Sequence, residues 1–271
     1  MSGEGEFEIE QLRIARDLLE NPGLAARISD LAGTPIERGF EMLPERWGQV
    51  VNAATRKAIE STLDIALGTL GSGYRGTASN WWHKSAATAT GATGGVFGLG
   101  ALAIELPIST GIMLRSIADI ARSEGEDLAA AEARVQCLQV LALGGRSRND
   151  DAAETGYFAA RAAMARAVSE AAAHLARKGL AEQSAPALVR LVSQVASRFS
   201  IVVSEKAAAQ AVPLIGAFGG AAINAIFIDH FQDMARGHFI VRRLERNHGS
   251  ESVRRMYAEL GGASSPKQLS S

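Results

Sequence analysis

Cysteine is almost missing from this 271-residue chain, and aromatic residues make up only 6% of it. The single cysteine, Cys137, excludes an internal disulfide and a multi-cysteine zinc or iron–sulfur site. Its neighbours Leu138, Val140 and Leu141 are apolar, which predicts a buried structural thiol rather than a nucleophile. Because aromatic side chains are scarce, the core must be built mainly from Ala, Leu, Ile and Val.

An excess of either charge is also missing, since 28 basic and 29 acidic residues give a net charge of −1. Nucleic-acid binders usually carry a basic excess or a basic stripe. The one basic cluster, Arg242, Arg243 and Arg246, is interrupted by Glu245, and we interpret it as a solvated helix face. We therefore expect no nucleic-acid partner.

The sequence lacks recognisable catalytic motifs. Gly71-x-Gly73-x-x-Gly76 fits the dinucleotide fingerprint, but a helical pattern precedes it and no βαβ unit surrounds it, so we dismiss the match. There is no Walker motif, no Gly-x-Ser-x-Gly and no His-Glu-x-x-His. We expect no catalytic residues, no cofactor and no enzymatic activity.

A secretory leader is not recognisable either. The first ten residues, 1–10, are acidic and lack both a basic start and an apolar core, the two features of a signal peptide. Together with the single cysteine, this predicts a reducing, cytoplasmic location.

Helix-forming residues dominate what is present. Hydrophobic residues make up 47% of the chain, alanine occurs in runs such as 171–173 and 207–209, and alternating strand patterns are almost absent. The fold class is therefore all-α, a multi-helix bundle. Proline and glycine positions predict helices over 8–20, from about Pro22 and Pro35, from Pro44 to about Leu70, from Pro107 to about Arg122, and over 128–143, 151–177, 185–199 and 251–260. We expect a helical extension over 1–45, a helical domain over 46–260 and a disordered tail over 261–271.

Two long segments carry no charge. One has 20 residues between Lys84 and Glu105, and the other has 22 between Lys206 and Asp229. They look like weak copies of each other, because GATGG at 91–95 matches GAFGG at 216–220 and each is followed by an Ile-acid pair.

Glycines four residues apart lie on one helix face and let two helix backbones approach closely. Both segments are long enough to span a bilayer, but they are rich in Ala and Gly, and Pro213 interrupts the second. We favour two central glycine-rich helices of a soluble bundle, with membrane insertion and reversible docking on a membrane surface as alternatives. The helix-packing glycines are Gly91, Gly94, Gly95, Gly98, Gly216, Gly219 and Gly220.

Polar side chains near these segments are the candidate contacts for a ligand or partner. Arg115, Asp119 and Arg122 repeat at helical spacing, which fits a surface salt-bridge ladder or a site where Arg115 binds an anionic headgroup. Asp229, His230, Asp233 and His238 form a cluster whose spacing is generic for a helix terminus, so we predict no metal site. The candidates are Glu105, Arg115, Asp119, Tyr157, Arg161, Asn224, Asp229 and His230.

Four stretches together resemble the EcsC family: GATGGVFGLGALAIELPISTGIMLRSIADIARSEGED, LALGG, GYFAARAAM and AVPLIGAFGGAAINAIFIDHFQDMARGHFIVRRLE. The resemblance covers roughly residues 50–257. It implies a bacterial protein related to one encoded beside an ATP-binding-cassette (ABC) transporter. It carries no established activity and no agreed catalytic residues.

We therefore expect a non-enzymatic helical accessory protein that is cytoplasmic and docks on the inner face of the membrane or on an ABC transporter. The rival hypothesis is a protein that binds a lipid or another apolar ligand between the glycine-rich helices. A hydrolase or metalloenzyme using Asp229, His230 and Asp233 is the third.

Overall fold

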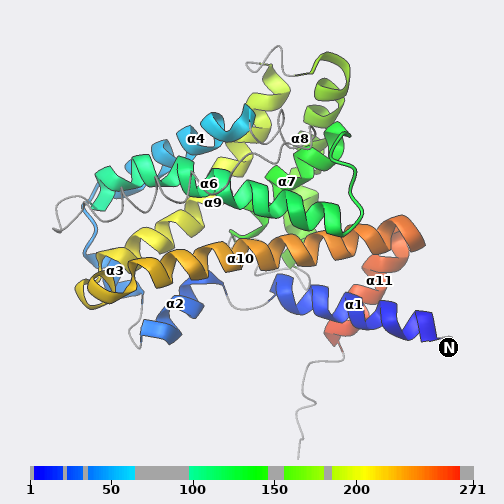
Figure 1. Ribbon diagram of the computed structural model, residues 1–271, viewed down its shortest axis with the longest axis horizontal. Coiled ribbons are helices and arrows are strands. Elements are labelled where there is room, and N and C mark those ends of the chain that lie inside the picture. The colour runs from blue at the N-terminus through cyan, green and yellow to red at the C-terminus, as the bar shows by residue number, and fades with distance from the viewer. Residues whose placement is uncertain are drawn as a thin grey trace, which may run out of the picture.

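The computed structural model describes residues 3–20, 23–32, 36–64, 98–145, 156–179 and 185–262. All regular secondary structure in these ranges is helical (Figure 1), so the all-α expectation is confirmed. The helices are α1 (Gly3–Glu20), α2 (Leu24–Ala32), α3 (Glu37–Glu41), α4 (Trp47–Asp64), α6 (Gly98–Ser123), α7 (Ala131–Leu143), α8 (Gly156–Lys178), α9 (Pro186–Ala211), α10 (Pro213–His248) and α11 (Ser250–Gly262).

Helix α9 lies at the centre of the bundle, where it contacts α2, α3, α4, α6, α7, α8 and α10. Leu188, Leu191, Val195, Phe199 and Val202 follow the three- and four-residue spacing of one helix face, and all are buried. Among the described residues, α9 is the helix that is long and apolar enough to cross a membrane. Half of its most apolar window is buried in the bundle, and a core helix of a soluble protein passes the same test.

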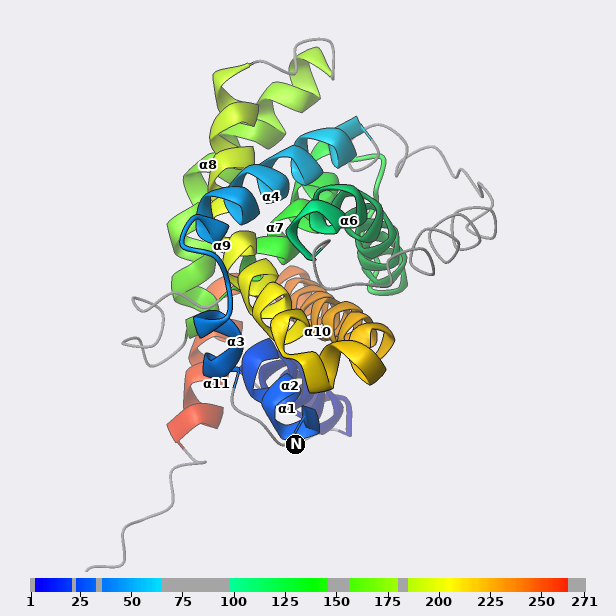
Figure 2. The same cartoon turned by 90° about the vertical axis from the view of Figure 1, so that its left-hand side faces the viewer.

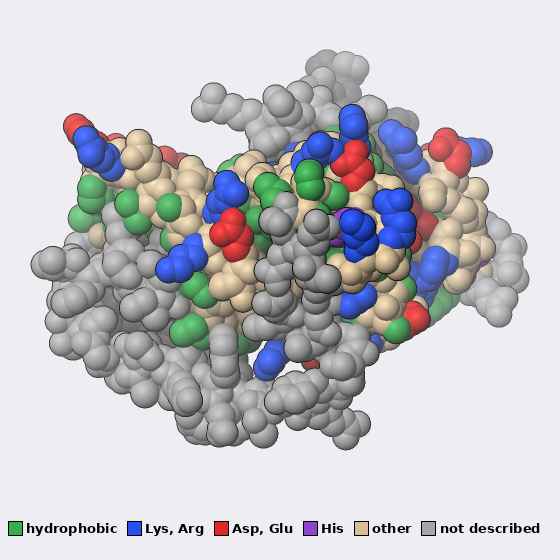
Figure 3. All heavy atoms as spheres, turned by 90° about the horizontal axis from the view of Figure 1, so that it is seen from above, with side chains coloured by type: hydrophobic (Ala, Val, Ile, Leu, Met, Phe, Trp, Pro, Cys, Tyr) green, Lys and Arg blue, Asp and Glu red, His purple; other side chains and the backbone are tan. Residues whose placement is uncertain are grey.

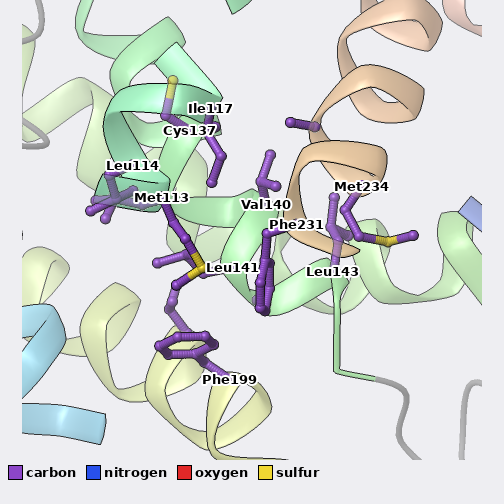
Figure 4. Packing of buried hydrophobic residues seen from close by; sticks show 14 of the residues in the cluster. Met113, Leu114, Ile117, Cys137, Val140, Leu141, Leu143, Phe199, Phe231 and Met234 are labelled. Atoms are coloured by element: carbon purple, nitrogen blue, oxygen red, sulfur yellow. The ribbon is translucent and has the colours of Figure 1, made fainter. Parts of the chain in front are cut away.

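Aliphatic and aromatic side chains from four helices interlock in the core (Figure 4). Met113 of α6 extends toward Phe199 of α9, and Val140 of α7 lies beside Phe231 of α10. The rings of Phe199 and Phe231 meet edge to face, with centroids 5.3 Å apart, an arrangement that aromatic pairs favour. Phe227 joins this aromatic contact, with its ring centroid 5.3 Å from that of Phe231.

The N-terminal helices pack on the same core as the rest of the chain. α1 lies along α10, and α2 contacts both α9 and α10. Leu12, Ala15 and Leu19 form the buried face of α1, and the backbone of Gly237 in α10 lies so close beneath it that a Cβ there would be 2.6 Å from Leu19 Cγ. Residues 1–45, which we expected to be an extension, therefore contribute three helices to this hydrophobic core.

One proline prediction is wrong. Pro107 does not begin a helix, because α6 starts at Gly98 and runs through it. Proline removes one helical hydrogen bond, and the buried side chains of Leu106, Met113 and Leu114 keep the helix packed on its neighbours. Pro213 does interrupt the second uncharged segment, because α9 continues to Ala211 and α10 begins at Pro213, where proline is suited to the first turn.

Helices α6 and α10 run in the same direction, both beginning at the left of Figure 1 and ending toward the right. Gln232 of α10 donates a hydrogen bond of 2.9 Å to Ser116 Oγ of α6, which fixes their register. At the far end, Gly249 has a φ of 82°, a left-handed conformation that glycine adopts without strain. The chain turns there into α11.

Candidate functional site

An ion pair joins the inner boundaries of the two uncharged segments. Lys206 Nζ lies 2.6 Å from Glu105 Oε1, and the lysine side chain is 0% exposed whereas the glutamate side chain is 34% exposed. The ammonium also lies 4.7 Å from the centroid of the Phe227 ring, a cation–π distance. A buried ammonium needs a counter-charge. The Glu105 carboxylate supplies it and is thereby held beside the start of the second segment.

This pair brings both segments to one end of the bundle. Residues 98–104 of the first segment begin α6, and the second comprises 207–211 of α9 and 213–228 of α10. We call these residues the uncharged end; none of them is charged. Figure 2 views the molecule from this side, with the start of α10 in front and α6 above it.

The candidate residues of α6 lie behind the uncharged end. Arg115 is half-buried, and within the described part of the chain it has no ion-pair partner. Asp119 is exposed and accepts a hydrogen bond of 2.7 Å from Arg122, which is the helical ladder that the spacing predicts. Arg115 is therefore the available cation on this stretch of α6.

Three candidate residues of α10 have different surroundings. Asp229 is exposed, and His230 is buried with its Nε2 3.1 Å from the carbonyl oxygen of Gly144. Asn224 is half-buried, and its Oδ1 is shielded from solvent without a hydrogen-bond partner among the described residues. These three side chains are close in sequence, but they differ in exposure to solvent and in hydrogen-bond partners.

The hypothesis of a metal or hydrolytic site at Asp229, His230 and Asp233 gains no support from the geometry. Asp233 pairs with Arg27 of α2 at 3.1 Å and with Arg236 at 3.2 Å. In the part of the chain that the structure describes, no three His, Cys, Asp or Glu side chains are grouped as metal ligands would be. The carboxylate of Asp233 instead attaches α2 to α10.

Tyr157 and Arg161 of α8 belong to a buried chain of hydrogen bonds. Arg161 Nη1 donates to the Tyr157 hydroxyl oxygen at 3.2 Å, and that hydroxyl lies 2.9 Å from His238 Nδ1. His238 Nε2 lies 3.1 Å from Gln136 Oε1, which only accepts, so Nε2 carries the proton and Nδ1 accepts from Tyr157. Arg161 also donates two hydrogen bonds, of 2.9 and 3.0 Å, to the carboxylate of Glu245.

Burial keeps the centre of this chain neutral. It lowers the pKa of His238 well below its ordinary range, and the nearby guanidiniums of Arg161 and Arg242 lower it further. Burial also raises the pKa of Tyr157, with Arg161 partly offsetting the rise. Both groups are therefore uncharged at neutral pH, and their hydrogen bonds connect α7, α8 and α10.

The basic cluster near the end of α10 binds the turn that follows α6. Arg242 Nε lies 2.8 Å from Glu126 Oε1, Arg246 contacts the same carboxylate, and Arg243 lies 3.2 Å from Glu124. The interpretation of this cluster as a solvated face is wrong for Arg242, whose side chain is only 14% exposed. Burial raises the pKa of Glu126, but the two arginines outweigh that effect, so the pKa is lowered.

Charges of both signs lie on the upper face of the molecule. Seen from above, basic and acidic side chains are interspersed, with hydrophobic side chains also visible toward the left (Figure 3). The ion pairs at Arg13–Glu10, Arg56–Glu60 and Arg166–Glu170 are of this exposed type, and each contributes little to stability.

The helix-packing glycines fall into two groups. Gly98 begins α6, and Gly216, Gly219 and Gly220 lie in the first turns of α10. Gly91, Gly94 and Gly95 lie outside the described residues. Close packing between these glycines therefore stays a prediction, as does the location of the glycine-rich segments at the centre of the bundle.

Sequence reasoning missed several polar residues. Lys206, His238 and Gln136 are buried, and their partners are about 80 or more positions away in the chain. Glu205 of α9 accepts a hydrogen bond from the backbone N–H of Ala25 in the first turn of α2, and burial raises its pKa to about 7. Two of these residues had a sequence signal. Lys206 bounds the second uncharged segment as Glu105 bounds the first, and His238 belongs to the Asp/His cluster of α10, although nothing in the sequence linked it to Tyr157 or Gln136.

Comparison with known proteins gives one match. Residues 8–244 match the model of the EcsC protein family, which confirms the resemblance and extends it to the N-terminal helices. Searches of curated proteins and of solved structures found no match.

Proposed function

The chain belongs to the EcsC protein family, and we propose that it is a non-enzymatic, cytoplasmic accessory protein that docks with its uncharged end on the inner face of the membrane. The observation that carries this proposal is the ion pair between Glu105 and the buried Lys206. That pair neutralises the charges nearest to the uncharged end and brings both uncharged segments to the same part of the molecule.

The dimensions favour peripheral docking. Pro213 and Asp229 are separated by 16 residues of continuous helix, which corresponds to about 24 Å at 1.5 Å per residue. A hydrocarbon core is about 30 Å thick, and α10 continues past Asp229 into charged residues. The uncharged stretch of α10 is therefore too short to cross the hydrocarbon core.

The candidate contact Asp229 directly follows the uncharged end, whereas Arg115 and Asp119 lie further along α6, about 17 and 23 Å from Ile104 at 1.5 Å per residue. A guanidinium binds phosphate oxygens through two parallel hydrogen bonds, and Arg115 has no ion-pair partner within the described chain. We propose that Arg115 contacts lipid phosphate. The exposed carboxylates of Asp119 and Asp229 are suited to basic residues of a protein partner, and the family resemblance suggests an ABC transporter in the same membrane.

Fractionation of cells that produce the protein tests this function. Membranes are washed in turn with high salt, carbonate and detergent. We expect release by salt or carbonate, because the proposal is peripheral docking. Release only by detergent would mean insertion, and full recovery in the soluble fraction would exclude membrane docking.

A lipid or another apolar ligand enclosed in the bundle is the second candidate. Asn224 favours it, because its shielded Oδ1 lacks a partner among the described residues and it lies within the second uncharged segment. An unpaired buried amide is costly, and a ligand hydroxyl could satisfy it. Native mass spectrometry of the purified protein tests this: a co-purifying lipid supports the candidate, and a mass equal to that of the chain alone counts against it.

A further inference from the structure

An exposed apolar corner adjoins the uncharged end. It consists of α3, the turn after it and the first turn of α4. Met42 is 53% exposed and Val50 is 40% exposed, which is unusual for large apolar side chains gathered in one place. Trp47 lies between them in the sequence, and its ring contacts that of Phe40, with centroids 5.5 Å apart. We call Phe40, Met42, Trp47 and Val50 the α3–α4 corner.

A close backbone contact fixes where this corner lies. A Cβ on Gly39 of α3 would be 2.0 Å from the carbonyl oxygen of Ala208 and 2.6 Å from its carbonyl carbon. α3 therefore packs directly on the last turn of α9. Because Ala208 belongs to the second uncharged segment, the corner is continuous with the uncharged end.

The charges beside the corner indicate which surface it fits. Glu37, Glu41 and Glu45 alternate with Arg38 and Arg46, and all five are exposed. Their sum is slightly negative, so neither nucleic acid nor an anionic lipid surface would be attracted to them. A surface that combines exposed apolar groups with nearly balanced charge is complementary to a zwitterionic lipid interface.

We propose that the α3–α4 corner inserts into the interface of a zwitterionic bilayer, with Met42 and Val50 entering among the acyl chains and Trp47 at the level of the headgroups. Tryptophan is enriched at that depth because its ring is apolar and its N–H is polar. This inference rests on the proposed membrane docking and identifies a second contact for it.

The first experiment compares two valines of equal exposure. Val50 is 40% exposed and Val189, near the start of α9, is 41% exposed. Purified protein is mixed with phosphatidylcholine vesicles and floated on a density gradient. We expect Val50→Asp to lower the partition coefficient at least about tenfold, because a carboxylate must then leave water, whereas Val189→Asp leaves it unchanged. Met42→Asp replaces Val50→Asp if circular dichroism shows that the latter is unfolded.

The second experiment follows Trp47 itself. The chain has three tryptophans, at 47, 81 and 82, so a Trp81→Phe, Trp82→Phe variant leaves Trp47 as the fluorophore. With vesicles whose acyl chains carry bromine near the headgroup, we expect a blue shift and quenching of Trp47 emission. Replacing part of the phosphatidylcholine by phosphatidylglycerol should leave this quenching of Trp47 unchanged.

Three outcomes separate the inference from the proposed function. If the wild type floats with vesicles but Val50→Asp matches Val189→Asp and Trp47 is not quenched, the corner does not contact lipid although the membrane docking stands. Strong dependence on anionic lipid would overturn the neutral insertion proposed here. If the wild type never floats with vesicles, both the insertion of the corner and the proposed membrane docking are wrong.

Discussion

The pair formed by Glu105 and Lys206 should show an asymmetric response to mutation. Replacing Glu105 by Gln keeps the shape of the side chain but removes the negative charge, so the 0% exposed ammonium is left with the Phe227 ring and a neutral amide. Breaking a buried ion pair from one side typically costs 3–5 kcal/mol. Since Glu105 is 34% exposed and the amide can still accept a hydrogen bond, we expect about 3 kcal/mol.

Removing the lysine should cost less. Lys206→Met keeps the volume and eliminates the buried charge, and the partly exposed carboxylate of Glu105 can turn toward water. The loss should be about 1 kcal/mol, mainly from the hydrogen bond and the cation–π contact. The double variant should resemble Lys206→Met, so that the cycle gives a coupling free energy of about 2–3 kcal/mol.

Urea denaturation at pH 7, followed by circular dichroism, measures these differences as shifts in midpoint at constant slope. Arg56→Met, with its exposed partner Glu60, is the matched control and should change stability by less than about 0.5 kcal/mol. The reasoning is refuted if Glu105→Gln costs less than Lys206→Met, or if the double variant is as unstable as the sum of the two single variants.

Three other side chains give independent tests. Burial raises the pKa of Glu205 from 4.5 to about 7, so the folded protein binds a proton that the unfolded chain does not; the resulting stability is full below pH 4.5 and is lost as pH rises through 7. The free energy of unfolding of Glu205→Gln should therefore rise relative to that of the wild type between pH 5 and 8, by about 3 kcal/mol at most. Urea titrations measure this, with the exposed Glu41→Gln as control. A stability difference between Glu205→Gln and the wild type that does not change with pH would contradict the prediction. Gly39→Ala should destabilise the protein by about 1–3 kcal/mol, because the new Cβ would clash with backbone atoms. Gly48→Ala should not, because nothing lies within 4 Å of a Cβ at that position. Thermal melts of the two variants measure the difference. Cys137 is buried and its pKa is raised to about 12, chiefly by desolvation, so it should react with a thiol reagent only in denaturant; fast labelling of the native protein would place it at the surface.

Residue composition and the positions of proline predicted the secondary structure well where tertiary contacts do not override them. Alanine runs and the absence of alternating patterns indicated an all-α fold, and proline begins α9 at Pro186 and α10 at Pro213 as expected for a first turn. The same rule was wrong for Pro107 because packing along α6 maintains the helix through it. Tertiary contacts decided that case, and they are not visible in local spacing.

The candidate site shows the same limit. The four-residue spacing of Tyr157 and Arg161 marked a pair, and the two are hydrogen-bonded. Their partners His238 and Glu245 lie 81 and 84 positions further along the chain. No spacing rule connects residues that far apart, because the bundle topology brings them together. Lys206 was likewise noted only as a boundary, since its burial depends on how α9 packs against α6.

Ion pairs at both ends of α6 and α10 bear on how the uncharged end could meet a membrane. Glu105 and Lys206 connect α6 and α9 at one end, and Arg242 binds Glu126 at the other. Because the chain passes from α9 into α10 across Val212 alone, the first pair also positions the start of α10. Two parallel helices fixed at both ends cannot separate without breaking buried charge pairs, which is costly. The helices that form the uncharged end are therefore held in one arrangement, and vesicle binding should leave the helix content unchanged.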